Sequence, residues 1–242
     1  MTRLYAPLPY ALDAEFDLPE DAHHHWVRVL RARLGDTAEL FDGAGLAARV
    51  ELIDIHKRGA RVRVLELTEA FNESPLHTHL GQVMSKGERL DYALQKAVEL
   101  GVSEITLLTS ERCELKLRGE ERADKKLAHW QRVMIGACEQ SGRNTLPLLH
   151  GPISVTDWQV QVEAEQKWVL APAVTGGPDS NQRPTSVALL IGPEGGLSDS
   201  EIVAAQQAGF QPWQLGPRVL RTETAPVAAL SVLQLLYGDY GL

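Results

Sequence analysis

The sequence predicts an α/β protein in which a small β-rich N-terminal unit precedes a larger unit built on a mainly parallel sheet. Polar and apolar residues alternate before about residue 70, which is typical of half-buried strands. After about residue 77, short apolar runs alternate with amphipathic helical segments, which favours a parallel sheet. The polar, proline-containing residues 71–75 separate the two patterns. We therefore predict two domains, residues 1–72 and residues 73–242.

The N-terminal unit is predicted to be a short helix followed by a β-meander that closes into a barrel. Residues 61–67 alternate almost strictly and residues 46–55 alternate in part, so each run is expected to be a strand. The Asp-Gly-Ala-Gly sequence at residues 42–45 predicts a hairpin turn that joins the second run to a strand over residues 38–41. Residues 57–59 supply the next turn.

The expected helix covers residues 21–33 and places four apolar side chains on one side: Trp26, Val27, Leu30 and Leu34. It also contains the run His23-His24-His25. Adjacent helix residues point about 100° apart, so these histidines cannot easily share one ion, and no metal site is predicted. Two interpretations of the run stay open. It is either a solvated helix face or part of a basic surface for RNA, together with three arginines: Arg28, Arg31 and Arg33.

The second unit is expected to alternate strands and helices along the chain. The predicted strands are residues 79–84, 105–108, 168–171, 187–191 and 211–215. The predicted helices are residues 90–100, residues 124–140, a helix that opens at the capping box of residues 198–201 and ends at Gly209, and residues 226–237.

The composition excludes several classes of protein. With 242 residues, 44% apolar and 23% charged, the chain has the balance of a folded globular protein. No run approaches the roughly 18 apolar residues of a membrane span, and the N-terminus lacks the features of a signal peptide. Cys113 and Cys138 are the only cysteines and lack CxxC spacing, which fits a reducing compartment. We expect a cytoplasmic protein without membrane or metal.

The net charge of −8 argues by itself against a nucleic-acid partner. The charge is unevenly distributed, however, because residues 73–143 carry 11 basic and 11 acidic side chains whereas residues 144–242 carry 4 and 9. A basic cluster is expected in the middle of the chain: Arg112, Lys116, Arg118, Arg122, Lys125 and Lys126. Its residues 116–126 form either an RNA contact or a solvated charged loop, since three acidic residues lie among them: Glu120, Glu121 and Asp124.

The strongest local motif is Leu-Ile-Gly-Pro-Glu-Gly-Gly-Leu-Ser at residues 190–198, where a buried strand runs into a glycine-rich turn and a capped helix. Ligands of open α/β sheets bind beyond the carboxyl ends of strands, and glycines there allow close approach of the backbone. The simpler alternative is a tight turn without a ligand. The motif is neither a P-loop nor a GxGxxG fingerprint, which disfavours ATP and NAD.

Two further loops follow predicted strands, at residues 215–226 and 170–173. Arg221 and Glu223 in the first of them could form a simple surface ion pair. Residues 137–144 end the long helix with five polar side chains, which suit either a polar ligand or a C-terminal cap built around Gly142. Cys138 is not expected to be a nucleophile, because no activating histidine lies near it in the sequence.

Eight segments of the chain form an ordered set: residues 24–31, 42–43, 86–89, 95–102, 139–143, 191–197, 215–216 and 220–225. In their order and spacing, these segments resemble the RsmE family of the SPOUT superfamily. The resemblance implies an N-terminal PUA-like β-barrel and a C-terminal α/β domain with a trefoil knot. It also implies S-adenosylmethionine as cofactor, methylation of N3 of one uridine of 16S ribosomal RNA within the small ribosomal subunit, and an obligate homodimer that completes the site.

The resemblance also implies roles for particular residues. The expected cofactor-binding residues are Leu170, Ala171, Pro172, Ile191, Gly192, Pro193, Glu194, Gly195, Gly196, Leu215, Gly216, Leu220, Thr222, Thr224 and Ala225. The expected RNA-binding residues are Arg28, Arg31, Arg33, Lys86, Arg89, Lys96, Arg112 and Arg143. The expected catalytic residues are Arg221 or Arg143, to hold the base or its phosphate, and Glu139 or Glu223, to assist removal of the proton. Two alternatives remain: a non-catalytic RNA-binding or ribosome assembly factor, and a SPOUT methyltransferase with another RNA target.

Overall fold

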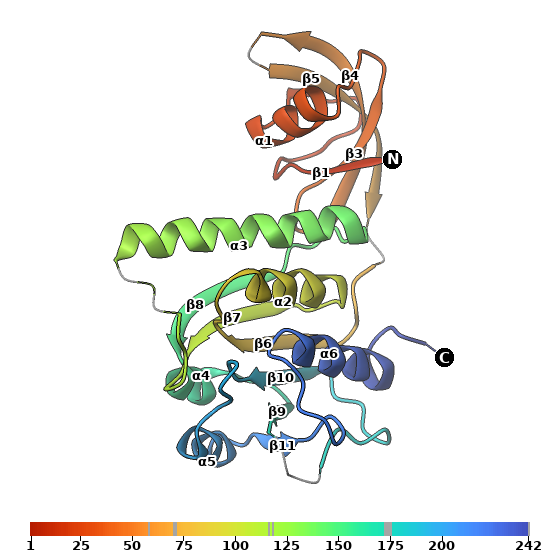
Figure 1. Cartoon of the computed structure of the whole chain (residues 1–242). Helices are drawn as coiled ribbons and strands as arrows, with labels where there is room; N and C mark the ends of the chain where they lie inside the picture. The colour runs from red at the N-terminus through yellow and green to blue at the C-terminus, as the bar shows by residue number, and fades with distance from the viewer. Residues whose placement is uncertain (58, 70–71, 116, 118, 172–175, 242) are drawn as a thin grey trace. The chain divides into compact units, whose positions relative to one another are not determined.

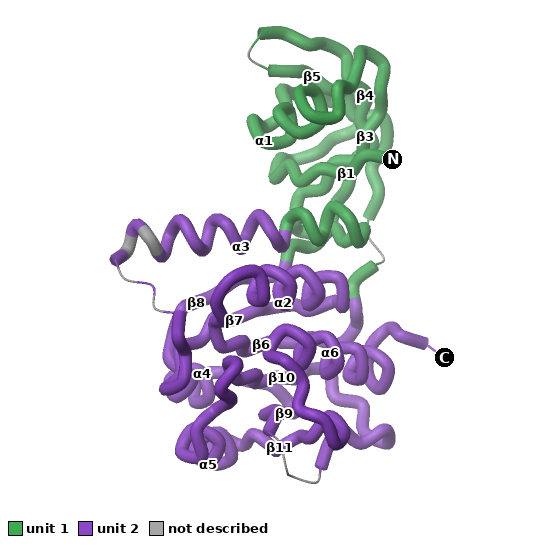
Figure 2. The backbone as a smooth tube through the Cα atoms, viewed as in Figure 1, with its two compact units in different colours: residues 1–73, 135–146 green, residues 74–134, 147–242 purple. Residues whose placement is uncertain are grey.

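A computed structural model describes residues 1–57, 59–69, 72–115, 117, 119–171 and 176–241. The chain forms two compact units (Figure 2). Unit 1 contains residues 1–73 and 135–146, and unit 2 contains residues 74–134 and 147–242. Backbone hydrogen bonds attach the later segment to unit 1, because Leu146 donates to the Gly43 carbonyl at 2.9 Å and Gly45 to the Asn144 carbonyl at 3.3 Å.

Unit 1 is built on one five-stranded sheet in the order β1-β3-β4-β5-β2 (Figure 1). Its strands are β1 (Thr2–Tyr5), β2 (Glu15–Asp17), β3 (Thr37–Phe41), β4 (Leu46–His56) and β5 (Gly59–Glu69). The predicted meander of three strands is confirmed as the antiparallel β3, β4 and β5. In β5, Val62 and Val64 are buried in the core of the unit while Arg61 and Arg63 are exposed. The short strands β1 and β2 were not predicted, since three or four residues carry too little alternation.

The predicted helix over residues 21–33 is shorter and more irregular than expected. An α-helical turn α1 (Glu20–His23) continues into a π-helix η1 (His24–Val29), and Arg31 then adopts a left-handed backbone with φ of 60°. Trp26 is buried, as predicted, but Leu30 and Leu34 are exposed, so the predicted apolar face is wrong there. The wider π turn and the left-handed residue break the 3.6-residue period on which that face depended.

Unit 2 is built on a six-stranded sheet in the order β11-β9-β10-β6-β7-β8, and all of its strand pairs are parallel. The strands are β6 (His77–Val83), β7 (Glu104–Thr109), β8 (Leu148–Ser154), β9 (Gln166–Leu170), β10 (Ser186–Ile191) and β11 (Gln211–Trp213). The parallel sheet and five of its strands are confirmed, with ends shifted by a few residues. Strand β8 was missed because Gly151 and Pro152, which are typical of turns, interrupt its apolar residues.

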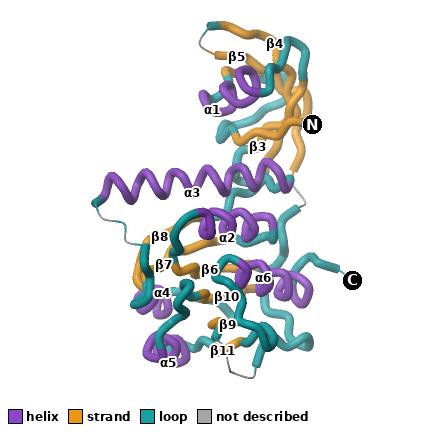
Figure 3. Tube along the Cα trace, in the orientation of Figure 1, coloured by secondary structure: helices purple, strands orange, loops and turns teal. Residues whose placement is uncertain are grey.

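Helices flank this sheet (Figure 3). They are α2 (Glu88–Glu99), α4 (Val155–Gln161), α5 (Asp199–Gln207) and α6 (Thr224–Tyr237), whereas α3 (Glu120–Ser141) begins in unit 2 and ends in unit 1. The predicted capping box of α5 is confirmed, because the Ser198 hydroxyl accepts from the Glu201 N–H and the Glu201 carboxylate accepts from the Ser198 N–H. Helix α4 was not predicted. Within the described residues, no helix has the length and apolar character that crossing a membrane requires.

A histidine lies inside unit 2, away from the loops that follow the strands. His79 of β6 is partly buried against Trp158, and its Nε2 atom lies 2.8 Å from the Thr106 hydroxyl. Burial, together with the neighbouring rings of His150 and His77, outweighs the opposing charge of Glu104 and lowers the pKa of His79 to about 4. His79 is therefore neutral in the folded protein at pH values where an unfolded chain would be protonated.

This difference predicts that the protein loses stability as the pH falls. Folding lowers the pKa of His79, so its contribution to the free energy of unfolding depends on pH. That contribution is complete above the unfolded pKa of about 6.5 and is lost as the pH falls toward the folded pKa. Between pH 7.5 and pH 5 we expect a loss of about 2 kcal/mol in the free energy of unfolding, measured by urea denaturation. The His79→Asn variant should lose less stability over the same interval. An identical pH dependence in both proteins would contradict this assignment.

Candidate cofactor pocket at the carboxyl ends of the strands

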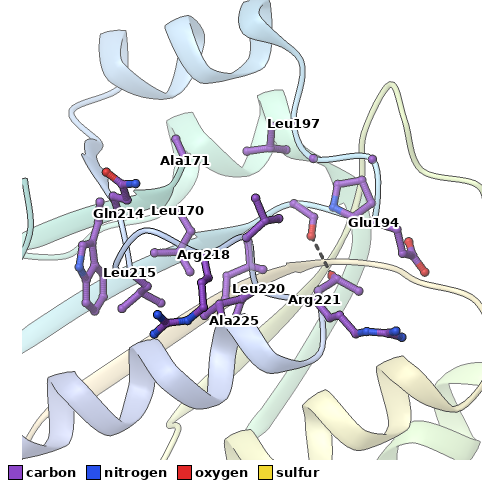
Figure 4. A pocket seen from close by; sticks show the side chains of 18 of the residues that line it. Leu170, Ala171, Glu194, Leu197, Gln214, Leu215, Arg218, Leu220, Arg221 and Ala225 are labelled. Carbon is purple, nitrogen blue, oxygen red and sulfur yellow. Dashed lines mark hydrogen bonds between the residues drawn. The ribbon is translucent and has the colours of Figure 1, made fainter. Parts of the chain in front are cut away.

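A cavity of about 860 Å³ opens in unit 2 where β9, β10 and β11 end. Leu170, Ile191 and Trp213, the last residues of these three strands, all line it. Figure 4 shows side chains that line the cavity. Because the strands are parallel, their carboxyl ends meet at one edge of the sheet, and the predicted loops after β10 and β11 meet Leu170 and Ala171 around one space. The remainder of the third predicted loop, residues 172–173, lies outside the described residues.

The glycine-rich loop of residues 192–197 forms one wall of the cavity. It is folded tightly, since a Cβ atom added to Gly192 would lie 2.9 Å from the Leu197 nitrogen. Gly196 adopts a positive φ of 69° and donates its N–H to the Pro193 carbonyl at 2.9 Å. The close packing at Gly192 therefore requires a residue without a side chain.

Residues 214–223 pass the carboxyl ends of the strands on the way from β11 to α6 and form the opposite wall. Thr222 fastens this segment, because its hydroxyl donates to the Gly192 carbonyl at 2.8 Å and accepts from the buried Gln82 amide at 3.2 Å. The helix α6 that follows packs against α2. Three elements far apart in the sequence thus meet at Thr222. The trefoil knot implied by the resemblance stays a prediction.

Two polar side chains at this wall have the chemistry of a reactive site. Arg221 is exposed to solvent at the cavity. Glu223 carries an Oε2 atom that is buried without a hydrogen-bond partner among the described residues. A buried carboxylate oxygen without a partner is unfavourable, unless a ligand donates a proton or brings a positive charge.

Most residues predicted to bind a cofactor line this cavity. They are Leu170, Ala171, Ile191, Gly192, Pro193, Glu194, Gly195, Gly196, Leu215, Gly216, Leu220, Thr222 and Ala225. Thr224 is exposed as the first residue of α6 and does not line the cavity. Pro172 lies outside the described residues. Sequence reasoning missed Trp213, Gln214 and Ile202, although Trp213 could have been found as an aromatic residue near the end of a predicted strand, whereas Arg218 belongs to the loop of residues 215–226 that the sequence indicated.

The four predicted catalytic residues fall into two groups. Arg221 and Glu223 line the cavity of unit 2, whereas Glu139 and Arg143 belong to unit 1. Glu139 accepts a hydrogen bond from the Tyr5 N–H at 3.1 Å, and burial raises the pKa of its carboxyl group. In the same segment, burial raises the pKa of the Cys138 thiol to about 11, which agrees with the prediction that Cys138 is no nucleophile.

Arg143 has a partner inside unit 1. Its side chain is buried, and its Nη2 atom lies 2.6 Å from Glu73 Oε2. The Nε atom also donates to this carboxylate, at 3.2 Å. In addition, the Arg143 carbonyl accepts from the Arg3 guanidinium at 3.0 Å. The Arg143 guanidinium is therefore placed to stabilise unit 1, and we do not assign it to binding the uracil base or RNA.

The other predicted RNA-binding residues differ in their exposure to solvent and in the partners that bind them. In unit 1, Arg28, Arg31 and Arg33 are exposed, and Arg28 donates only a long hydrogen bond of 3.3 Å to the Lys57 carbonyl. In unit 2, acidic partners lie beside three of them, in the pairs Lys86–Glu114, Arg89–Glu194 and Lys96–Glu99. Arg112 donates to backbone carbonyls of the glycine-rich loop. Lys116 and Arg118 lie outside the described residues, as does the side chain of Arg122.

Two family models match the chain. One, described as an RNA methyltransferase domain, matches residues 72–234, and the other, described as an RNA methyltransferase PUA domain, matches residues 18–65. Together with the parallel sheet and its strand-end pocket, these matches define the class: an RNA methyltransferase with an N-terminal PUA-like β domain. The predicted fold class is confirmed at this level.

Relatives and solved structures specify the family. A ribosomal RNA small subunit methyltransferase E of Buchnera aphidicola is 37% identical over 98% of this chain and 97% of its own length. The Bacillus subtilis protein of that name is 30% identical over 93% of each chain. A crystal structure of the Neisseria gonorrhoeae protein of the same name, bound to S-adenosylmethionine, has a TM-score of 0.93 and 39% identity over 100% of both chains. The chain belongs to the ribosomal RNA small subunit methyltransferase E family, RsmE.

A further structure, of a methyltransferase from Legionella pneumophila in complex with S-adenosylmethionine, has a TM-score of 0.94 and 41% identity over 98% of both chains. The resemblance identified from the sequence is thereby confirmed. Because these proteins cover almost all of the chain, both units belong to the similarity.

Proposed function

We propose that this protein transfers the methyl group of S-adenosylmethionine to N3 of one uridine in the RNA of the small ribosomal subunit. The observation that carries the proposal is the cavity of about 860 Å³, which is lined by Leu170 and Ala171 and by the loops after β10 and β11 that the sequence indicated. We assign RNA binding to residues 1–72 and methyl transfer to residues 73–242. A homodimer that completes the site belongs to the same proposal, and light scattering of the purified protein tests it.

The residues around the cavity fit S-adenosylmethionine. Tightly folded backbone with glycines allows peptide groups to approach an adenine edge and an amino-acid moiety closely. The buried Oε2 atom of Glu223 has no hydrogen-bond partner in the described part of the chain, and a carboxylate favours a cationic ligand such as a sulfonium. When bound, the cofactor supplies an electrophilic methyl group on sulfur. The residues that would hold it are the thirteen described above as lining the cavity.

The chemistry requires that uracil N3 lose its imide proton before or during attack on the methyl group. Glu223 is placed to accept that proton, because it is a partly buried carboxylate at the cavity with an acceptor atom to spare. Arg221 is exposed at the same wall, where a guanidinium would stabilise the uracil anion through its carbonyl oxygens. Positioning of the two reactants contributes on the order of 7–11 kcal/mol to lowering the barrier.

These roles predict that Glu223→Gln and Arg221→Met each lower the single-turnover rate at saturating RNA and cofactor by about a hundredfold. Cofactor affinity should change much less than the rate. Single-turnover methylation of small ribosomal subunits measures the rate, and calorimetry measures cofactor affinity. If both variants react at the wild-type rate, Arg221 and Glu223 do not carry the reaction.

Two experiments test the function itself. Calorimetry of the wild-type protein with S-adenosylmethionine should show saturable binding, whereas a non-catalytic assembly factor without a working cofactor site would show none. Mass spectrometric mapping of small-subunit RNA from a strain that lacks this protein should reveal one uridine without its N3 methyl group. A missing methyl group on another nucleotide would establish a different RNA target.

A further inference from the structure

The loop after β7 is hydrogen-bonded to the glycine-rich loop of the cofactor pocket. The Nη1 atom of Arg112 donates to the Gly195 carbonyl at 2.9 Å and to the Leu197 carbonyl at 3.2 Å. The aliphatic part of Arg112 packs against the same loop, since a Cβ atom added to Gly195 would lie 3.4 Å from Arg112 Cβ. One side chain therefore contacts the glycine-rich loop through both its charge and its stem.

The two peptide groups that Arg112 binds are also held at their N–H ends. The peptide between Gly195 and Gly196 donates through the Gly196 N–H to the Pro193 carbonyl at 2.9 Å. The peptide between Leu197 and Ser198 donates through the Ser198 N–H to Glu201 Oε2 at 2.8 Å. Because each carbonyl is bound by Arg112 and each N–H has its own acceptor, neither peptide group can rotate without losing two hydrogen bonds.

A buried carboxylate ties the same two loops together a second time. Glu201 Oε1 accepts from the Glu111 N–H at 2.9 Å while its Oε2 atom accepts from Ser198. Arg112 also lines both the cofactor cavity and a neighbouring cavity of about 410 Å³. Arg112 thus lies in the wall between the two cavities, and its Nη1 atom is directed to the protein backbone.

We propose that Arg112 is a positioning residue for the cofactor, which holds the glycine-rich loop in its binding shape, and that it is not an RNA-binding residue. The inference depends on the proposed function, because it takes the cofactor to be S-adenosylmethionine. It replaces the role in RNA binding expected from the sequence, where a basic residue in a basic cluster indicated a phosphate contact.

The Arg112→Met variant tests this assignment, because methionine keeps the aliphatic packing and removes the charge and the donors. We expect the dissociation constant for S-adenosylmethionine to rise about tenfold or more in calorimetry. The Arg112→Lys variant retains a donor of shorter reach, and its dissociation constant should lie between those of the wild type and Arg112→Met. Without any cofactor, hydrogen exchange of the amides in residues 192–198 should be faster in Arg112→Met than in the wild type.

Arg183→Met is the matched control. Arg183 also donates to backbone carbonyls of its own loop, those of Ser180 and Gln182, but it does not line the cavity. Its removal should leave cofactor affinity unchanged.

The salt dependence of RNA binding tests whether Arg112 contacts RNA, because each lost phosphate contact lowers the slope of log affinity against log salt by about one. Arg28→Met should lower that slope, and Arg112→Met should not.

The outcomes separate the inference from the function. If the wild type binds no S-adenosylmethionine, the proposed function fails and the inference fails with it. If the wild type binds and Arg112→Met binds equally well, with unchanged exchange in residues 192–198, only the inference is overturned. A lower salt slope together with unchanged cofactor affinity in Arg112→Met would assign Arg112 to RNA instead.

Discussion

Replacing Gly192 by alanine is expected to weaken the binding of S-adenosylmethionine by about a hundredfold. The added Cβ atom would lie 2.9 Å from the Leu197 nitrogen and 3.1 Å from Leu197 Cγ. Backbone cannot yield as a flexible side chain does, so the loop must open. The Gly192 carbonyl would then also move away from the Thr222 hydroxyl. Calorimetry and single-turnover methylation measure the effect.

Gly136→Ala is the control for this prediction. Gly136 lies within α3, where an added Cβ atom would meet nothing within 4 Å. Alanine should therefore leave cofactor binding unchanged and stabilise the helix by about 0.5–1 kcal/mol. Wild-type affinity in Gly192→Ala would show that the glycine-rich loop makes only a turn and does not bind the cofactor.

The Arg143→Met variant is expected to lower the free energy of unfolding by about 3 kcal/mol, the largest effect on stability. The substitution leaves the Glu73 carboxylate without the guanidinium that binds it through Nη2 and Nε. The Arg143 side chain is 5% exposed and that of Glu73 30%, so water can replace only part of the lost donors. Urea denaturation, followed by the fluorescence of Trp26 in unit 1, measures the loss.

Arg61→Met provides a matched control in the same unit. Arg61 pairs with Asp17 at 3.3 Å, but both side chains are more than half exposed to solvent, at 51% and 58%. Such a pair contributes little, and the variant should unfold at nearly the wild-type urea concentration. If Arg143→Met unfolds like the wild type but no longer methylates RNA, Arg143 acts at the substrate as the sequence suggested.

The fold of unit 2 and the place of its pocket could be predicted from local patterns. Short apolar runs between amphipathic segments are sufficient to indicate parallel strands, and parallel strands bring their carboxyl ends to one edge. Loops that begin after Leu170, Ile191 and Trp213 must therefore be neighbours, whatever the details of packing. The capping box of Ser198 and Glu201 was equally visible, because both of its hydrogen bonds join residues three apart.

The sequence by itself thus determined the α/β class and the loops after β10 and β11 that line the pocket, since each depends on residue types at short spacing. The family was indicated by the resemblance of segments spread over nearly the whole chain. Only the tertiary structure decided which charged residues face a ligand. Arg143 meets Glu73 and Arg112 meets Gly195, partners 70 and 83 residues away in the chain. Both arginines looked like RNA contacts in the sequence, because a guanidinium is always charged. Whether it meets a phosphate, a buried carboxylate or a backbone carbonyl depends on contacts that form only when distant segments pack together.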